Sequence, residues 1–186
     1  AEGHAAAVDR QPDVDGAPYD PELGGAIICD NGFLYIFGGD GEDVAGGLHD
    51  SCFYSEIQTD GSLGAFQAGT TLPDTWWFPG VATIDNYIIA HPGIVGTRDR
   101  ADTTDSIYVC QVNTDGSMGS WALQSETLPE ARYNINLVAV ENTVFALGGR
   151  DNVDGYSQTT VWRAPFSAGT VGAWDTVTDV QLPGLG

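Results

Sequence analysis

Short apolar segments separated by glycine-rich and acidic turns recur along this chain. The segment 33–37 consists of large apolar side chains, and similar segments stand at 87–90 and 143–147. Segments of this length that are rich in aromatic and branched residues and bounded by turn residues predict strands rather than helices. Turns such as Asp30-Asn31-Gly32 supply the residue with positive φ that a tight hairpin needs. The pattern predicts an all-β fold of short antiparallel strands.

Three sequence markers repeat in step with these segments. They are an Asp-Gly turn that becomes Ala-Gly in its third copy, a Leu-Pro pair, and a pair of turn residues that contains glycine. Their positions are Gly61, Gly116 and Gly169 for the turn, Leu72, Leu128 and Leu182 for the Leu-Pro pair, and Gly38, Pro92 and Gly148 for the third marker. All three keep one period of about 55 residues, so the sequence contains three repeats.

Each repeat contains four expected strands. Their approximate ranges are 25–29, 33–37, 51–58 and 63–68 in the first repeat, 81–85, 87–90, 106–113 and 118–123 in the second, and 135–140, 143–147, 159–166 and 171–176 in the third. Four antiparallel strands in each repeat of roughly 40–50 residues are typical of the blades of a β-propeller.

The apolar segments and the markers resemble a known type of repeat. Segments 34–39 and 144–149 are similar to the second strand of the Kelch or galactose-oxidase type of propeller repeat, which ends in a Gly pair. The run 115–121, Asp-Gly-Ser-x-Gly-x-Trp, resembles a bacterial and viral variety of it. The second repeat departs from the pattern, because Pro92-Gly93 replaces the Gly pair. The resemblance implies a β-propeller of three four-stranded Kelch-like blades.

The same resemblance implies a domain organisation. We expect an N-terminal acidic arm or linker over 1–17 and a three-blade propeller segment over 18–186, with blades at about 18–71, 72–127 and 128–183. Propellers typically close with four to eight blades, so three blades form a half-propeller. We therefore expect either self-association, for example a dimer that closes a six-bladed ring, or completion by other blades of a longer chain or a larger assembly.

Self-association would use the two outer faces of the half-propeller. Each blade normally packs on two neighbours, and the first and third blades each lack one neighbour within this chain. We expect the apolar residues on these open faces to include Phe33, Tyr35, Val144 and Phe145. An exposed apolar surface as large as the face of a blade is typical of a protein–protein interface.

The charge of the chain limits its partners. Asp and Glu total 26 against six basic residues, all of them Arg, and the formal net charge is −20. No basic surface is available for phosphates, so we expect no nucleic-acid partner, and no apolar run is long enough for insertion into a membrane. Three interpretations of the acidic residues remain open: a solvated surface suited to high salt, oxygen ligands for Ca²⁺, or a surface for a cationic partner.

Aromatic residues outside the repeat pattern are the candidate ligand-binding residues. Trp76, Trp77 and Phe78 follow the Leu-Pro marker of the second repeat, and Arg132 and Tyr133 stand in the matching stretch of the third. Rigid aromatic side chains are common at recognition surfaces, and a glycan is the candidate ligand. The alternative is a packing role between neighbouring blades.

Acidic clusters are the candidate metal ligands. Calcium takes six to eight oxygen ligands. The clusters that could supply them contain Asp40, Glu42 and Asp43 in one loop and Asp13, Asp15 and Glu22 near the N-terminus. The alternative is solvated acid, because the whole chain is acidic. Calcium is the one candidate cofactor.

No catalytic motif stands out in the sequence. Nucleophile-elbow, phosphate-loop and dinucleotide-binding patterns are absent from the sequence, so we expect the protein not to be an enzyme. The first expectation is a structural or assembly module of a secreted, cell-surface or virion protein. The alternatives are an adhesion or receptor-binding module for glycan or protein and, more distantly, a propeller enzyme that acts on carbohydrate.

Overall fold

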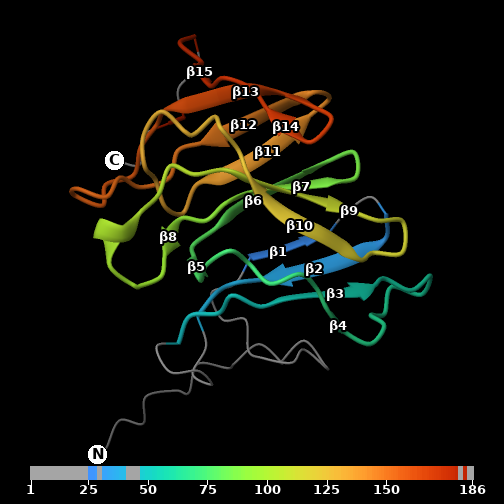
Figure 1. The fold of residues 1–186 in the computed structure, drawn as a ribbon. Coiled ribbons are helices and arrows are strands. Elements are labelled where there is room, and N and C mark those ends of the chain that lie inside the picture. Colours follow the sequence, from blue (N-terminus) through green and yellow to red (C-terminus); the bar gives the residue numbers. More distant parts are fainter. Residues whose placement is uncertain (1–24, 29–30, 41–46, 180–181, 184–186) are drawn as a thin grey trace, which may run out of the picture.

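The computed structural model describes residues 25–28, 31–40, 47–179 and 182–183 of the chain, with no account of the side chains of 25–28. Within these ranges the regular secondary structure is almost wholly β-strand, and the one helical turn is η1 (Arg100–Asp102). The strands form three stacked antiparallel sheets, with the second sheet between the first and the third (Figure 1). The predicted all-β fold is confirmed. The predicted arm at 1–17 lies outside the described residues.

Each sheet is built from strands that follow one another in the sequence. The first sheet contains β1 (Gly25–Ile28), β2 (Phe33–Phe37), β3 (Cys52–Glu56) and β4 (Gln67–Ala68). The second contains β6 (Gly80–Ile84), β7 (Tyr87–His91), β9 (Tyr108–Val112) and β10 (Met118–Leu123). The third contains β11 (Asn136–Val140), β12 (Thr143–Leu147), β13 (Val161–Ser167) and β14 (Thr170–Val171), with β15 (Asp175–Thr176) also paired to β13. A separate pair joins β5 (Trp76–Trp77) to β8 (Ile94–Val95).

The Asp-Gly turns show how the repeated sequence produces repeated local structure. In the first copy the Asp60 carboxylate accepts a hydrogen bond of 3.0 Å from the Ser62 amide, and Gly61 between them has φ of 84°. The second copy repeats this with Asp115 and Ser117, also at 3.0 Å. A positive φ is unstrained in glycine, so each turn reverses the chain tightly before the outer strand.

Two apolar cores hold the sheets together. The core between the first and second sheets centres on Phe37, Trp76 and Ile88. The core between the second and third sheets contains Ile89 and Trp162. Because successive side chains of a strand point to opposite faces, β7 contributes Ile88 to one core and Ile89 to the other. The second sheet is therefore apolar on both faces, as a sheet between two neighbours must be.

The third sheet has an outer face with exposed apolar side chains, but three of the four residues predicted on the open faces of the first and third blades are buried instead. Tyr35 and Val144 are completely buried in the two cores, and Phe33 is buried beside Tyr35. Phe145 does face outward, since it pairs with Val138, which is 42% exposed. The strand pattern predicts two faces, but it does not determine which of the two meets the neighbouring sheet.

No helix among the described residues is long and apolar enough to cross a membrane.

Candidate functional site

Three of the five predicted ligand-binding residues form one aromatic group. The rings of Trp77 and Phe78 lie 4.6 Å apart between centroids, and Phe78 lies 6.1 Å from Tyr133. Trp77 and Phe78 are half-buried, whereas Tyr133 is 6% exposed. The amide of Asn134 donates to the Phe78 carbonyl at 3.2 Å and so joins the two stretches that the repeat relates. The group lies where the second and third sheets meet.

The backbone beneath this group is tightly constrained. Phe78 has φ of 57°, and Gly93 approaches so closely that an added Cβ would lie 2.4 Å from the carbonyl oxygens of both Trp77 and Phe78. No other residue fits such a contact without a backbone shift, because a Cβ cannot come so near a carbonyl oxygen. Gly93 is the second residue of the Pro92-Gly93 pair, which replaces the Gly pair of the other two repeats. It therefore fixes the position of the aromatic group.

Trp76 lies inside the core. Its side chain is completely buried, and its ring contacts Tyr108 at 5.5 Å, Trp121 at 5.1 Å and Phe37 at 6.2 Å. These contacts are those of a packing residue between two sheets, which was the alternative interpretation of the aromatic run.

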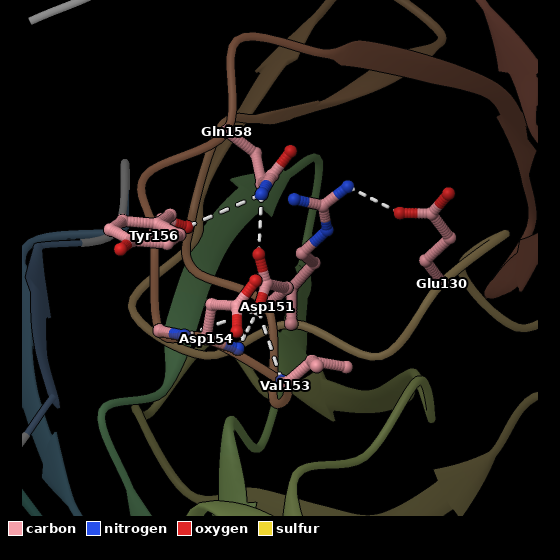
Figure 2. Close-up of polar contacts among 8 residues, drawn as sticks. Glu130, Asp151, Val153, Asp154, Tyr156 and Gln158 are labelled. Atoms are coloured by element: carbon pink, nitrogen blue, oxygen red, sulfur yellow. Dashed lines mark hydrogen bonds and ion pairs between the residues drawn. The ribbon is translucent and has the colours of Figure 1, made fainter.

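Arg132 is also turned inward. Its side chain is 2% exposed, and its guanidinium carbon lies 5.1 Å from the centre of the Trp162 ring. Its Nη2 atom pairs with Glu130 Oε2 at 2.5 Å, the contact drawn to Glu130 in Figure 2. Its Nε and Nη1 atoms are buried and have no hydrogen-bond partner in the described part of the chain.

A closed acidic loop borders the site between β12 and β13. Asp151 Oδ1 accepts from the amides of Val153, Asp154 and Gly155 at 2.8 to 3.2 Å, and Oδ2 accepts from Gln158 at 2.5 Å (Figure 2). These hydrogen bonds, above all that from Asp154, lower the pKa of the Asp151 carboxyl. Both oxygens of the Asp151 carboxylate therefore accept hydrogen bonds from residues of the same loop, and these bonds hold the loop in shape.

Backbone contacts attach this loop to the aromatic group. Tyr133 and Arg150 exchange reciprocal backbone hydrogen bonds of 3.0 and 2.8 Å. Arg100 Nη1 donates to the Asp154 carbonyl at 3.5 Å, and Gly155 lies against both Arg100 and the Tyr133 hydroxyl. Arg100 and Arg150 thus lie beside the aromatic group.

Of the predicted metal ligands, only Asp40 lies in the described part of the chain. Asp40 forms an ion pair with Arg98, which joins a loop of the first sheet to a loop of the second. The described residues hold no group of three or more His, Cys, Asp or Glu side chains that could bind a metal ion. The other predicted ligands, Asp13, Asp15, Glu22, Glu42 and Asp43, lie outside the described residues.

His91 is a polar residue of this region that the sequence prediction missed. It is completely buried, its Nε2 lies 3.0 Å from the Thr104 carbonyl oxygen, and its Nδ1 accepts from the Gly93 amide at 3.1 Å. Burial lowers the pKa of His91 to about 4. Its sequence signal was its repeat position, which holds Phe37 in the first repeat and Leu147 in the third.

An open groove of about 540 Å³ lies beside the Gly148-Gly149 pair of the third sheet. Its lining includes Asn134, Arg150, Gln158 and Leu182. The equivalent Gly pair of the first sheet is covered, because Gly39 donates a hydrogen bond of 2.9 Å to the carbonyl of Trp76.

The comparisons with known proteins place the fold. No protein-family model matches the sequence, and no curated protein matches it. Among solved structures, the chain is similar to YjhT of E. coli, a β-propeller, with a TM-score of 0.65 and 13% sequence identity. The match covers 91% of this chain and 54% of YjhT, so the chain spans about half the length of that protein. The likeness supports a propeller type of fold.

The same comparison corrects one sequence prediction. We expected the protein not to be an enzyme, because no familiar catalytic motif appears. The likeness to YjhT supports a propeller type of fold, which enzymes also use, so the exclusion of an enzyme was wrong. Propeller enzymes assemble their sites from loops of several sheets, which short sequence motifs do not reveal.

Proposed function

We propose that this chain is a segment of three Kelch-like propeller blades that assembles with a second copy of itself through the outer face of its third sheet. The two copies would form a six-bladed ring. We place such an assembly in a secreted, cell-surface or virion protein. The observation that carries the proposal is a contrast between equivalent positions of the second and third sheets.

The contrast is between Ala82 and Ile84 of β6 and the residues 56 positions later. Ala82 and Ile84 are 5% and 7% exposed, because the third sheet covers them. Val138 and Val140 of β11 are 42% and 56% exposed. The strand pairing is also equivalent in the two sheets. Ala82 lies opposite Ile89 in the second sheet, and Val138 lies opposite Phe145 in the third. The third sheet therefore presents the same face that the second buries.

A second copy suits this face in shape and in charge. In the first two sheets the matching face is covered by the next sheet, which is built from the next copy of the repeat. Arg163 stands there exposed, where the first and second sheets place the buried residues Tyr54 and Val109. A cation at this position offsets part of the repulsion between two copies that each carry a net charge of −20. The open groove beside Gly148-Gly149 lies where a neighbouring sheet would place its equivalent of Trp76.

The test is the mass of the protein in solution. We expect sedimentation at micromolar concentration to give about twice the chain mass of 19.6 kDa. The double substitution Val138→Asp and Val140→Asp would bury two unpaired charges and should weaken the dimer by on the order of 100-fold or more, giving monomers. The control is Val153→Asp, because Val153 is 81% exposed on a loop and should leave the dimer intact.

Two results would contradict self-association. One is a wild-type chain that stays monomeric and folded at every concentration, which would assign the covering blade to a longer chain or another protein. The other is a dimer that survives the double substitution as well as it survives Val153→Asp.

A second candidate function is the binding or turnover of a carbohydrate at the aromatic group. The observation that favours it is the cluster of Trp77, Phe78 and Tyr133 beside the arginines of two loops. Aromatic faces with nearby polar groups suit sugar rings. A glycan array, followed by an assay for release or conversion of each bound glycan, tests it. Binding that is unchanged in Phe78→Ala would exclude this cluster.

A further inference from the structure

Arg132 and Trp76 occupy the same position of the repeat, four residues after the Leu-Pro marker. Trp76 fills the junction between the first and second sheets and packs on Tyr108. Arg132 enters the junction between the second and third sheets and stacks on Trp162, which is the repeat equivalent of Tyr108. One junction therefore holds an indole, and the other holds a buried cation at the same place.

The buried cation has fewer hydrogen bonds than it can make. A guanidinium group carries five N–H donors and no acceptor. The described residues supply one acceptor, the Glu130 carboxylate at Nη2, and leave buried Nε and Nη1 without any. Buried donors are nearly always paired in native proteins, and a charged donor is the most costly to leave alone. The site therefore lacks at least one acceptor.

Glu130 is a weakly held partner. Its side chain is 64% exposed, whereas that of Arg132 is 2% exposed. Its carboxylate can therefore move into solvent without losing its hydration, and this motion opens Nη2. Displacement of this one exposed carboxylate therefore frees the Nη2 donor for another acceptor.

We propose that Arg132 binds a small oxyanion, a carboxylate, phosphate or sulfate group, in place of the Glu130 carboxylate. Nη2 lies between the two unpaired nitrogens in the planar fork of the guanidinium. An anion that takes over at Nη2 can direct a second oxygen to Nε or to Nη1 and so form a bidentate pair. The Trp162 ring lies against the guanidinium group and holds it in its stacked position. This inference does not depend on the proposed self-association.

Thermal unfolding with different anions tests the proposal. The probes are sodium sulfate, sodium phosphate and sodium acetate, each compared with sodium chloride at equal ionic strength. We expect sulfate or phosphate, or acetate if the site prefers a carboxylate, to raise the melting temperature of the wild type beyond chloride. Sulfate also stabilises proteins in general. The specific part is therefore the difference between the wild type and Arg132→Trp, which installs the residue of the equivalent junction, or Arg132→Met.

Removal of Glu130 gives the sharper prediction. If Glu130 competes with the anion, Glu130→Gln should lower the anion concentration at half-saturation about two- to fivefold, as expected for loss of an exposed ion pair. The control is Glu126→Gln, which removes the same charge from an exposed position nearby. A purely structural Arg132–Glu130 pair would not make Glu130→Gln bind anions more tightly than Glu126→Gln does.

The proposal is overturned if the anions stabilise the wild type and both Arg132 variants equally, or if Glu130→Gln and Glu126→Gln respond alike. In that case an ordered water molecule supplies the missing acceptor. If neither Arg132 variant folds, a sulfate and phosphate titration of the wild type, followed through the Nε–H resonance of Arg132, decides. A saturable shift supports the site, and an unchanged resonance rejects it.

Discussion

At the residue scale, the three repeats carry different residues at equivalent positions. These differences change the chemistry at the contact between two sheets, while the strands keep the same arrangement. Phe37, His91 and Leu147 end the second strand of each sheet. Phe37 packs among aromatic rings, whereas His91 is buried with both ring nitrogens in use. Because the Gly93 amide must donate to Nδ1, the hydrogen of neutral His91 is on Nε2 and is donated to Thr104.

His91 predicts a specific pH dependence of stability. Its pKa is about 4 in the folded state against 6.5 for an ordinary histidine. The unfolded state therefore binds more protons between these values, so stability is complete above about pH 6.5 and falls as the pH drops towards 4. This difference amounts to about 3 kcal/mol. We expect it as a slope in the free energy of unfolding, measured with urea at a series of pH values.

The matched variant is His91→Phe, which installs the residue of the first repeat. The variant loses two hydrogen bonds and should be less stable at pH 7. Its free energy of unfolding should not show the fall between pH 6.5 and 4 that the titration of His91 causes in the wild type. The 26 carboxyl groups titrate in both proteins, so the difference between the two pH profiles isolates His91. Parallel profiles would show that His91 is accessible to protons in the folded protein.

At the element scale, the sequence period predicted the inner strands well. Among the outer strands it predicted only that of the second sheet well, since β10 matches the expected 118–123. The second strands at 33–37 and 143–147 match β2 and β12. The expected outer strand at 63–68 is reduced to β4, two residues long, and the one at 171–176 is divided into β14 and β15. The inner strands carry apolar side chains on both faces and so leave a strong pattern, whereas the short, exposed outer strands of the first and third sheets do not.

The orientation of side chains was the less predictable part of the site. Trp76 and Trp77 are adjacent and both aromatic, yet Trp76 is completely buried and Trp77 is half-buried beside Phe78. Their pairing with β8 was not expected, because two-residue strands have no periodic signal. Arg132 was identified as a ligand-binding candidate, but its burial follows from the shape of a junction that the sequence does not contain. Alignment with Trp76 was the available signal.

At the scale of the whole molecule, charge is the dominant feature. The net charge is −20 over 186 residues, and in the described part of the chain acidic side chains such as Asp60, Asp115 and Asp154 are exposed. Two of the few arginines offset this locally: Arg98 pairs with Asp40, and Arg132 with Glu130. The remaining repulsion acts through solvent between exposed groups and opposes the compact state.

Salt should therefore stabilise the folded chain. The Debye length falls from about 30 Å at 0.01 M to about 8 Å at 0.15 M, so most of the screening of exposed charges develops in this range. We expect the melting temperature, followed by circular dichroism, to rise steeply over it and more slowly above. A melting temperature that does not change with NaCl would show that the acidic groups are already too far apart to repel.

The same titration with CaCl₂ at matched ionic strength separates screening from specific binding. The described residues offer no calcium cluster, so they contribute only the rise that NaCl also produces. A larger rise with calcium assigns a site to the acidic residues outside the described part, Asp13, Asp15, Glu22, Glu42 and Asp43. The variants Asp15→Asn and Glu42→Gln then identify the segment, because only substitution of a ligand lowers the calcium response to the level of sodium. Equal curves for the two salts would exclude calcium as a cofactor.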